Sequence, residues 1–359
     1  MSKATLFGEE LQSFVVIGSG PLSYGARGLE RMHEAGAGAV VTKTIGVEAA
    51  RNPNLHMVGA GAGSLVNCEG WSDYPGSQWV EREIPEAVSA GVKVIASIGQ
   101  TVADSAAFVE PIADAGVLAI ELVSYDRAKI VPLVRDARAR TDLPLVAKLS
   151  ANWPDMLEAA RQCEEEGADA FTACDSMGPA LRIDIERQAP VLGGPDGTGW
   201  LTGADILPFA LERVWELRRQ TSLPIIGLGG VTRWQDAVEM SMAGADLVGV
   251  CTLPILKGPA AVGKLVSGVD GWLAAHGHAR LADVSGAAQR DVATPHGRPF
   301  ELGFDLARCT HCGQCERVCA YEARGFDAAG EATVDYARCR HCGLCASVCP
   351  RDAISVEVA

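Results

Sequence analysis

The sequence predicts an α/β protein, a (β/α)8 TIM barrel followed by a small cysteine-rich module. Eight short apolar segments rich in β-branched residues recur between residues 14 and 253. Most of them are separated by stretches in which apolar residues recur at helical spacing. Eight of the 12 cysteines lie after residue 300. The length of 359 residues suits one large domain plus this module.

The expected strands and helices alternate along the first 253 residues. The strand candidates are 14–20, 39–45, 93–99, 117–123, 144–150, 170–176, 224–230 and 247–253. The helical segments between them include 102–115, 127–140, 155–166, 205–220 and 233–243. Continuously apolar strands separated by helices indicate a parallel sheet buried on both faces, and eight such units predict a closed barrel. A doubly wound open sheet is the alternative.

A glycine pair after the first expected strand invites comparison with a dinucleotide-binding loop. The segment reads Gly18-Ser19-Gly20-Pro21. A Rossmann loop needs a third glycine and a helix that opens directly from the loop, and Pro21 with the residues after it breaks that pattern. The sequence therefore disfavours NAD(P) or FAD at this loop.

Functional residues of a TIM barrel gather at the C-terminal ends of its strands, with phosphate on the loops after strands 7 and 8. Here strand 7 ends in 227–230 (GLGG), and Cys251-Thr252 ends strand 8. Backbone N–H groups at such glycines can hold a phosphate, although glycines also simply permit tight turns. Lys43 and Lys148 lie in apolar runs near the same end, where an unpaired charge is costly. Together they indicate an anionic ligand inside the barrel, the alternative being salt-bridged or snorkelling lysines.

The cysteines after residue 300 form two matching runs with the spacing C-x2-C-x2-C-x3-C. The runs are Cys309, Cys312, Cys315 and Cys319, and Cys339, Cys342, Cys345 and Cys349. This spacing is typical of ligands to [4Fe–4S] clusters. A pair of zinc sites is the alternative, and disulfides are disfavoured because thiolate ligands need a reducing compartment. The module therefore predicts one-electron transfer.

Residues 301–359 resemble a bacterial two-cluster ferredoxin, and residues 1–300 are expected to form the barrel domain. In such ferredoxins the fourth cysteine of each run ligates the other cluster. The resemblance therefore implies one cluster on Cys309, Cys312, Cys315 and Cys349, and a second on Cys339, Cys342, Cys345 and Cys319. Ala320 departs from the pattern, because proline is usual after the first run.

Composition excludes several classes of protein. The net charge of −14 argues against nucleic-acid binding, which needs a basic footprint. No apolar stretch is long enough to span a bilayer. The start of the chain, MSKATLFGEE, lacks the apolar core of a signal peptide. We therefore expect a cytoplasmic protein with no membrane or nucleic-acid partner.

The barrel also resembles a known family, the class 1 dihydroorotate dehydrogenases and the FMN half of dihydropyrimidine dehydrogenase. The resemblance covers roughly residues 10–290, and dihydropyrimidine dehydrogenase also ends in a two-cluster segment. The matching stretches are Ser19-Gly20, Thr42-Lys43-Thr44, Asn67, 146–149 (VAKL), 175–178 (DSMG), 184–186 (DIE), 197–203, 226–230, 250–252 and 281–286 (LADVSG).

The resemblance implies FMN as cofactor. Lys43 and Lys148 would face its ring system and favour the anionic reduced form. The other residues implied at the flavin are Ser19, Gly20 and Thr44 along the ring, Gly203, Gly229, Gly230, Cys251 and Thr252 around the phosphate, and Ser176, which is also expected to bind the cofactor. On the substrate side the family carries a catalytic Cys or Ser after strand 4, and this chain has 123–128 (VSYDRA) there instead.

The substrate loops differ from the family in charge. Asn67 is retained, but acidic residues stand at Glu69, Asp73, Asp126 and Asp175. Ionised carboxylates accept hydrogen bonds and repel anions, so we expect a substrate with more donors, or a positive charge, than orotate. Glu69 and Asp73 as solvated loop residues are the alternative. Tyr125 or Asp126 is the expected proton donor or acceptor.

The expected function is an oxidoreductase acting on a CH–CH or C=C bond of a small, pyrimidine-like substrate. Electrons would pass between FMN and the two clusters. A ferredoxin, a flavodoxin or a separate NAD(P)-binding subunit would be the electron partner, because no pyridine-nucleotide domain is evident. The alternative is an electron-transfer subunit in which FMN relays electrons within a larger complex. Homodimers are common among relatives of this barrel.

Overall fold

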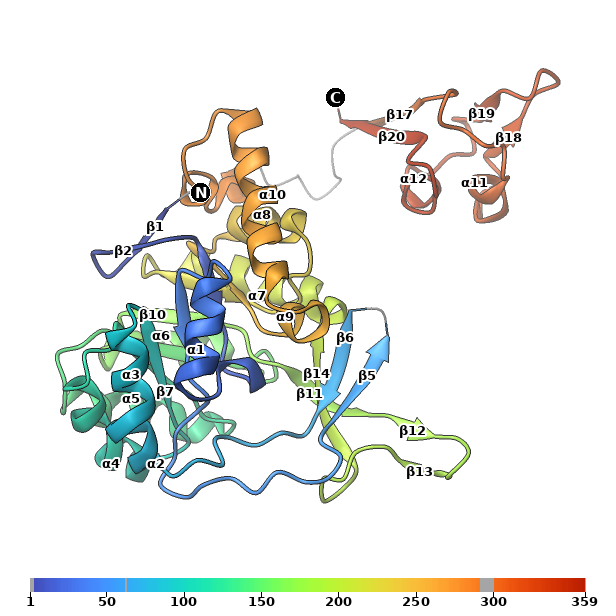
Figure 1. Cartoon of the computed structure of the whole chain (residues 1–359). Helices are drawn as coiled ribbons and strands as arrows, with labels where there is room; N and C mark the ends of the chain where they lie inside the picture. The colour runs from blue at the N-terminus through green and yellow to red at the C-terminus, as the bar shows by residue number, and fades with distance from the viewer. Residues whose placement is uncertain (1–2, 62, 291–299, 359) are drawn as a thin grey trace. The chain divides into compact units, whose positions relative to one another are not determined.

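A computed structural model describes residues 3–61, 63–290 and 300–358 (Figure 1). The chain forms two compact units, Met1–Arg290 and Asp291–Ala359. The sequence predicted a domain boundary between residues 300 and 301, whereas the two compact units divide between residues 290 and 291. Residues 291–299, which lie between these two positions, are outside the described ranges.

Eight parallel strands close the first unit into a barrel. They are β3 (Val15–Ile17), β4 (Ala39–Val41), β7 (Val94–Ile98), β8 (Ala119–Leu122), β9 (Leu145–Leu149), β10 (Ala170–Ala173), β15 (Ile225–Leu228) and β16 (Leu247–Val250). Their order around the barrel, β10-β15-β16-β3-β4-β7-β8-β9, confirms the predicted fold and excludes the doubly wound sheet. The strands end earlier than expected, because the chain leaves the ladder to form loops. Lys43 therefore lies after β4, whereas Lys148 lies within β9.

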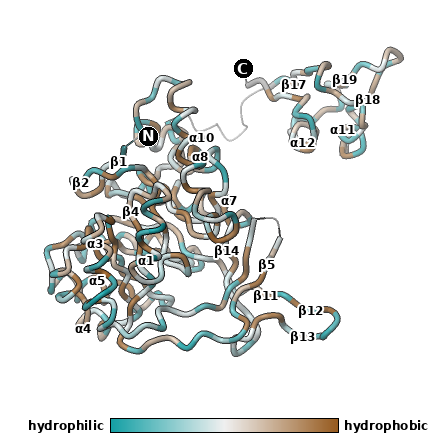
Figure 2. Tube along the Cα trace, in the orientation of Figure 1, coloured by the Kyte–Doolittle hydropathy of each residue, from teal (hydrophilic) through white to brown (hydrophobic). Residues whose placement is uncertain are grey.

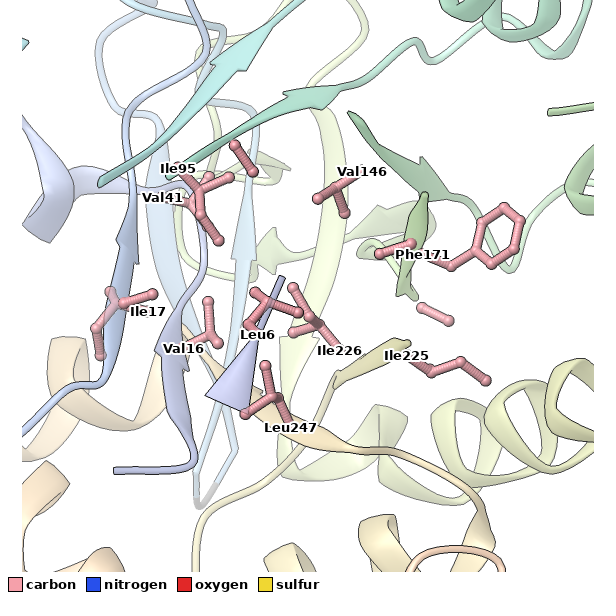
Figure 3. Packing of buried hydrophobic residues seen from close by; sticks show 14 of the residues in the cluster. Leu6, Val16, Ile17, Val41, Ile95, Val146, Phe171, Ile225, Ile226 and Leu247 are labelled. Carbon is pink, nitrogen blue, oxygen red and sulfur yellow. The ribbon is translucent and has the colours of Figure 1, made fainter. Parts of the chain in front are cut away.

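Every residue of these strands is buried, whichever face it points to, and most of them are apolar; Glu121, Lys148 and Thr172 are among the polar exceptions. An N-terminal hairpin that the sequence did not predict, β1 (Ala4–Leu6) and β2 (Glu9–Leu11), adds to this core. Leu6 is 2% exposed, and Figure 3 shows it among Val16, Ile226 and Leu247. Since Leu247 begins its strand, the hairpin covers the N-terminal end of the barrel and leaves the C-terminal end for function.

Helices surround the barrel strands. They are α1 (Gly25–Glu34), α2 (Gly76–Gln78), α3 (Ile84–Ser89), α4 (Val102–Ala113), α5 (Arg127–Arg138), α6 (Met156–Glu165), α7 (Leu207–Gln220), α8 (Trp234–Ala243), α9 (Thr252–Lys257) and α10 (Ala260–His276). Five of them confirm the predicted helical segments. Hydrophilic and hydrophobic residues alternate along α1, α3 and α5 (Figure 2), as expected of helices with one face on a sheet. None of the helices in the described ranges combines the length and apolar character needed to cross a bilayer.

A four-stranded sheet in the order β11-β14-β6-β5 was not predicted. It contains β5 (Met57–Gly61), β6 (Ser64–Asn67), β11 (Met177–Leu181) and β14 (Thr198–Gly203), and a hairpin of β12 (Ile183–Asp184) and β13 (Ala189–Pro190) projects beside it (Figure 1). Asn67 pairs with Trp200 across β6 and β14. The sheet thereby brings two loops of the barrel, far apart in sequence, to one side of the strand ends.

The second unit consists of two antiparallel strand pairs and two short helices. The pairs are β17 (Phe300–Phe304) with β20 (Ile354–Val358), and β18 (Arg324–Phe326) with β19 (Ala332–Val334). The helices α11 (Gln314–Arg317) and α12 (Leu344–Ser347) each begin after a left-handed glycine, Gly313 or Gly343. The two halves of the module therefore repeat one structure, as the matching cysteine runs predict.

A buried carboxylate joins the loops after β4 and β7. Asp104 accepts hydrogen bonds from the backbone N–H groups of Val47, Gln100 and Thr101 at 2.7–2.8 Å. We expect Asp104→Ala to lower the free energy of unfolding by about 3 kcal/mol, because it leaves buried donors unpaired. Urea denaturation followed by tryptophan fluorescence measures this. Asp114→Ala, at the exposed end of the same helix, should change it by less than about 0.5 kcal/mol, and equal losses in both variants would contradict the assignment.

Candidate active site

A cavity opens at the C-terminal ends of the barrel strands and, together with the open solvent at its mouth, takes up about 1000 Å³. All of the predicted barrel site residues line it except Asp73 and Asp126. Those in the lining are Ser19, Gly20, Lys43, Thr44, Asn67, Glu69, Tyr125, Lys148, Asp175, Ser176, Gly203, Gly229, Gly230, Cys251 and Thr252. They come from the loops after β3, β4, β8, β10, β15 and β16, from β9, and from the added sheet.

Close backbone packing forms the floor of the cavity. A Cβ atom on Gly20 would lie 2.6 Å from the Cys251 sulfur, so this position admits no larger residue while Cys251 keeps its place. Gly230 has a φ of +82°, which favours glycine, and it packs against the start of α7. These glycines therefore serve the turn and the close packing of the protein's own chain, as the simpler interpretation held.

Lys43 does not carry an unpaired charge. Its Nζ lies 2.6 Å from Oε2 of Glu69, and the two side chains are only 7% and 9% exposed. Glu69 is thus a buried partner of the lysine, and its interpretation as a solvated loop residue is wrong. Asp73, in contrast, is exposed and lies outside the lining; its backbone N–H donates to the Tyr24 hydroxyl. The structure therefore brings one of the two loop carboxylates into the site.

Lys148 is also paired with an acid. Its Nζ lies 3.4 Å from Oδ1 of Asp175. Burial opposes the charge of Lys148, but the carboxylates of Asp175 and Glu121 outweigh burial and raise its pKa above the ordinary value. Glu121 accepts a hydrogen bond from Thr172 at 2.9 Å. Burial is the main cause that raises the pKa of the Glu121 carboxyl. The site therefore keeps a permanent cation at Lys148.

Tyr125 contributes a phenol to the cavity. Its ring stacks on Trp200 with centroids 5.9 Å apart and planes 12° apart. The side chain is half exposed because it faces the cavity, and Gln100 holds its backbone N–H at 2.9 Å. Exclusion of water by the surrounding protein, together with the Asp175 carboxylate, raises the pKa of Tyr125 to about 12. The hydroxyl is therefore neutral and keeps its proton at physiological pH.

Asp126 has a different position. Its Oδ1 accepts a hydrogen bond from the Ala128 backbone N–H, which makes it the N-cap of α5. Its Oδ2 lies 3.5 Å from Nζ of Lys129, and its side chain is 50% exposed. Since Asp126 lies outside the cavity lining, the geometry supports Tyr125 over Asp126 as the proton donor.

Several lining residues were not predicted. They include Met57, Leu65, Trp71, Cys174, Thr202 and Ile206. Trp71 follows Gly70 in the Glu69 loop and donates from its indole N–H to the Glu48 carbonyl at 2.6 Å. The sequence signal that could have identified Trp71 as a lining residue is its place two positions after the loop carboxylate Glu69. Burial raises the pKa of the Cys174 thiol to about 12 and that of Cys251 to about 11, so both are neutral.

The cysteines of the second unit line two separate cavities. Cys309, Cys312, Cys315 and Cys349 line one of about 450 Å³, and Cys319, Cys339, Cys342 and Cys345 line another of about 370 Å³. Each set combines three cysteines of one run with the last cysteine of the other. The ligand sets implied by the ferredoxin resemblance are therefore the sets that the fold brings together. Within the described residues, no three His, Cys, Asp or Glu side chains converge as ligands of a single metal ion.

Comparison with known proteins decides the family. The dihydroorotate dehydrogenase family model matches residues 1–273. The chain belongs to the dihydroorotate dehydrogenase family. A 4Fe-4S dicluster domain model matches residues 290–353. The family resemblance is thereby confirmed for both parts of the chain.

Curated relatives of the chain include catalytic subunits named dihydroorotate dehydrogenase B (NAD(+)). The protein from Methanothermobacter thermautotrophicus is 33% identical over 312 residues, which covers 80% of this chain and 98% of the relative. That from Pyrococcus furiosus is 32% identical over 304 residues, covering 80% and 99%. The chain is thus a family oxidoreductase of the CH–CH type with an iron–sulfur module.

The barrel residues fit the FMN of this family. FMN carries a phosphate and, when reduced, a negative charge on its ring. The cavity supplies the cationic Lys148, neutral thiols and glycine backbone. Lys148 would stabilise the anionic ring, and the strand-end glycines Gly229 and Gly230 would accept the phosphate closely.

Proposed function

We propose that this protein is an FMN- and iron–sulfur-dependent oxidoreductase for the C=C or CH–CH bond of a small pyrimidine-like ring that lacks a carboxylate. Electrons pass between the flavin and two [4Fe–4S] clusters. The names of the relatives favour a ring related to dihydroorotate. The charges of this cavity argue against dihydroorotate itself.

The Lys43–Glu69 pair carries this proposal. A substrate carboxylate needs an unneutralised cation or a set of donors. Glu69 already neutralises Lys43 at 2.6 Å in a site largely shielded from solvent, and Lys148, which lies 3.4 Å from Asp175, would be occupied by the anionic flavin ring. A third carboxylate would enter beside two others at low local dielectric, where like charges repel strongly. A neutral or cationic ring with N–H donors meets the carboxylates as acceptors instead.

The residues of the chain divide the work of the reaction. Bound FMN supplies hydride chemistry at the substrate carbon. Tyr125 holds a proton on its phenol oxygen at the cavity face, and its stacking on Trp200 fixes the ring. The Asn67 side-chain amide donates to the Trp200 carbonyl at 3.3 Å, which fixes that amide in the lining. Glu69 and Asp175 would accept hydrogen bonds from the ring of the substrate.

The electron partner follows from the relatives' names. They are catalytic subunits of NAD(+)-linked enzymes, which supports a separate NAD(P)-binding subunit. A ferredoxin or flavodoxin partner and a homodimeric assembly stay predictions from sequence. The two four-cysteine cavities support two clusters as the route between flavin and partner.

A substrate panel tests the proposal. Purified protein reconstituted with FMN is reduced anaerobically, and its reoxidation by conjugated cyclic C=C compounds is followed at the flavin absorbance. We expect uracil-like rings without a carboxylate to reoxidise the flavin at least about 10²-fold faster than orotate, since about 3 kcal/mol of repulsion corresponds to that factor. Faster reaction with orotate would refute the proposed substrate class. Absence of FMN from the heat-released chromophore would refute the cofactor.

A further inference from the structure

The two halves of the cluster module differ at one buried, structurally equivalent position. Arg324 stands five residues after Cys319, and Ile354 stands five residues after Cys349. Each is the first residue of a strand, β18 or β20. Arg324 is 6% exposed and Ile354 is 8% exposed. The repeat therefore carries a buried cation in one half where the other half carries an apolar side chain.

The contacts of Arg324 leave its charge uncompensated. Nη1 donates to the Thr333 carbonyl at 3.0 Å, and the guanidinium lies 4.4 Å from the centroid of the Phe304 ring. Nε and Nη2 are buried and have no hydrogen-bond partner among the described residues. Arginine stays charged in proteins, and a buried charge without an anionic partner is costly. This arrangement calls for an anion at the two unsatisfied nitrogen atoms.

Arg324 lines both four-cysteine cavities, whereas Ile354 lines the one that contains Cys349 and not the one that contains Cys319. Ala323, the residue before Arg324, donates its backbone N–H to the Cys319 sulfur at 3.3 Å. The buried cation therefore borders the ligands of both predicted clusters.

We propose that Arg324 is a positioning residue that holds its cation against the two iron–sulfur clusters whose cavities it lines and raises their reduction potentials. One-electron reduction adds a negative charge to a cluster, and a nearby cation or hydrogen-bond donor stabilises the reduced state. Ile354, at the equivalent position of the other half, supplies no charge. This inference rests on the two-cluster assignment of the proposed function.

A redox titration monitored by electron paramagnetic resonance tests the proposal in the full-length protein. Arg324→Ile, which installs the residue of the other half, should lower the potential of at least one cluster by at least about 59 mV, a tenfold change in the reduction equilibrium. Arg324→Lys should fall between it and the unaltered protein, because it keeps the charge without the planar fork.

Arg308→Gln is the matched control. It removes a cation of the same module, but this side chain is 53% exposed and pairs with Asp352 at 3.6 Å, so solvent screens its charge. The proposal is supported if Arg324→Ile lowers a cluster potential by at least about 59 mV and Arg308→Gln shifts it by less than half as much. Smaller shifts in both clusters, or an equal shift with the control, overturn it.

Two further measurements keep the outcome interpretable. If Arg324→Ile bound less iron than the unaltered protein, Arg324→Gln would replace it under the same thresholds. Iron and acid-labile sulfide analysis of the unaltered protein tests the presence of two clusters separately from the role of Arg324. Fewer than two clusters per chain would contradict the proposed function, whereas two clusters with unshifted potentials would contradict only the role of Arg324.

Discussion

Tyr125→Phe should slow the transfer of a proton to the reduced substrate carbon, and with it reoxidation of the flavin by substrate, by about 10²–10⁴-fold. The substitution removes one oxygen atom and keeps the ring that stacks on Trp200. The backbone bond to Gln100 is also unaffected. Binding should therefore change little and the rate constant greatly. Anaerobic stopped-flow measurement of flavin reoxidation at saturating substrate gives that rate constant.

Asp126→Asn is the matched control on the neighbouring residue. Asparagine is as good a helix N-cap as aspartate, so α5 should be preserved and the rate should stay within about twofold. A large loss in Asp126→Asn with none in Tyr125→Phe would reverse the assignment. Unchanged rates in both variants would exclude the whole loop as the proton source.

The pH dependence separates the same two groups. The donor is the protonated form, which exists below the pKa of the group. Because the pKa of Tyr125 is raised to about 12, a tyrosine donor should give a flat rate from roughly pH 6 to 9, with a decline only as the pH approaches 12. A carboxyl donor with an ordinary pKa would lose rate as the pH rises through about 4 to 6. Such a profile would contradict Tyr125.

The barrel was predictable because its strands are buried on both faces and read as continuous apolar runs. The added sheet was not, for a physical reason. Its strand β5 has the sequence MVGAG, whose glycines disfavour a strand by themselves. Its strand β6 pairs with β14, more than 130 residues later. Pairing at this sequence distance is set by tertiary packing around the strand ends, which a local pattern does not carry.

The candidate site shows the same division between local and long-range information. Lys43 and Lys148 were predictable as charges in apolar runs. Their partners were not, because Glu69 lies 26 residues from Lys43 and Asp175 lies beyond another helix. Asp126 is the opposite case: an aspartate directly before a helix is a common N-cap. The resemblance, in which a catalytic residue follows strand 4, favoured an acid–base role for Asp126 and obscured that local signal.

Glu69→Gln should shift the preference of the cavity from neutral rings towards anionic rings. The substitution keeps the size of the side chain and removes the negative charge that lies 2.6 Å from Lys43. Lys43 then becomes an available cation in a poorly solvated site. We expect kcat/KM for dihydroorotate, used as a carboxylate-bearing probe, to rise about 10²-fold relative to a ring without a carboxylate, or about 3 kcal/mol in differential stabilisation.

Asp73→Asn provides the comparison that gives this result its meaning. It removes the same charge from the same loop, but at an exposed position outside the cavity lining. Screening by solvent should limit its effect on the preference to about twofold. If the two variants shifted the preference equally, the effect would reflect the net charge of the protein and not the Lys43–Glu69 pair. If neither variant shifted the preference, the shape of the cavity, and not its charge, would exclude a carboxylate. Removal of the Glu69 charge would then have left the barrier to carboxylate binding intact.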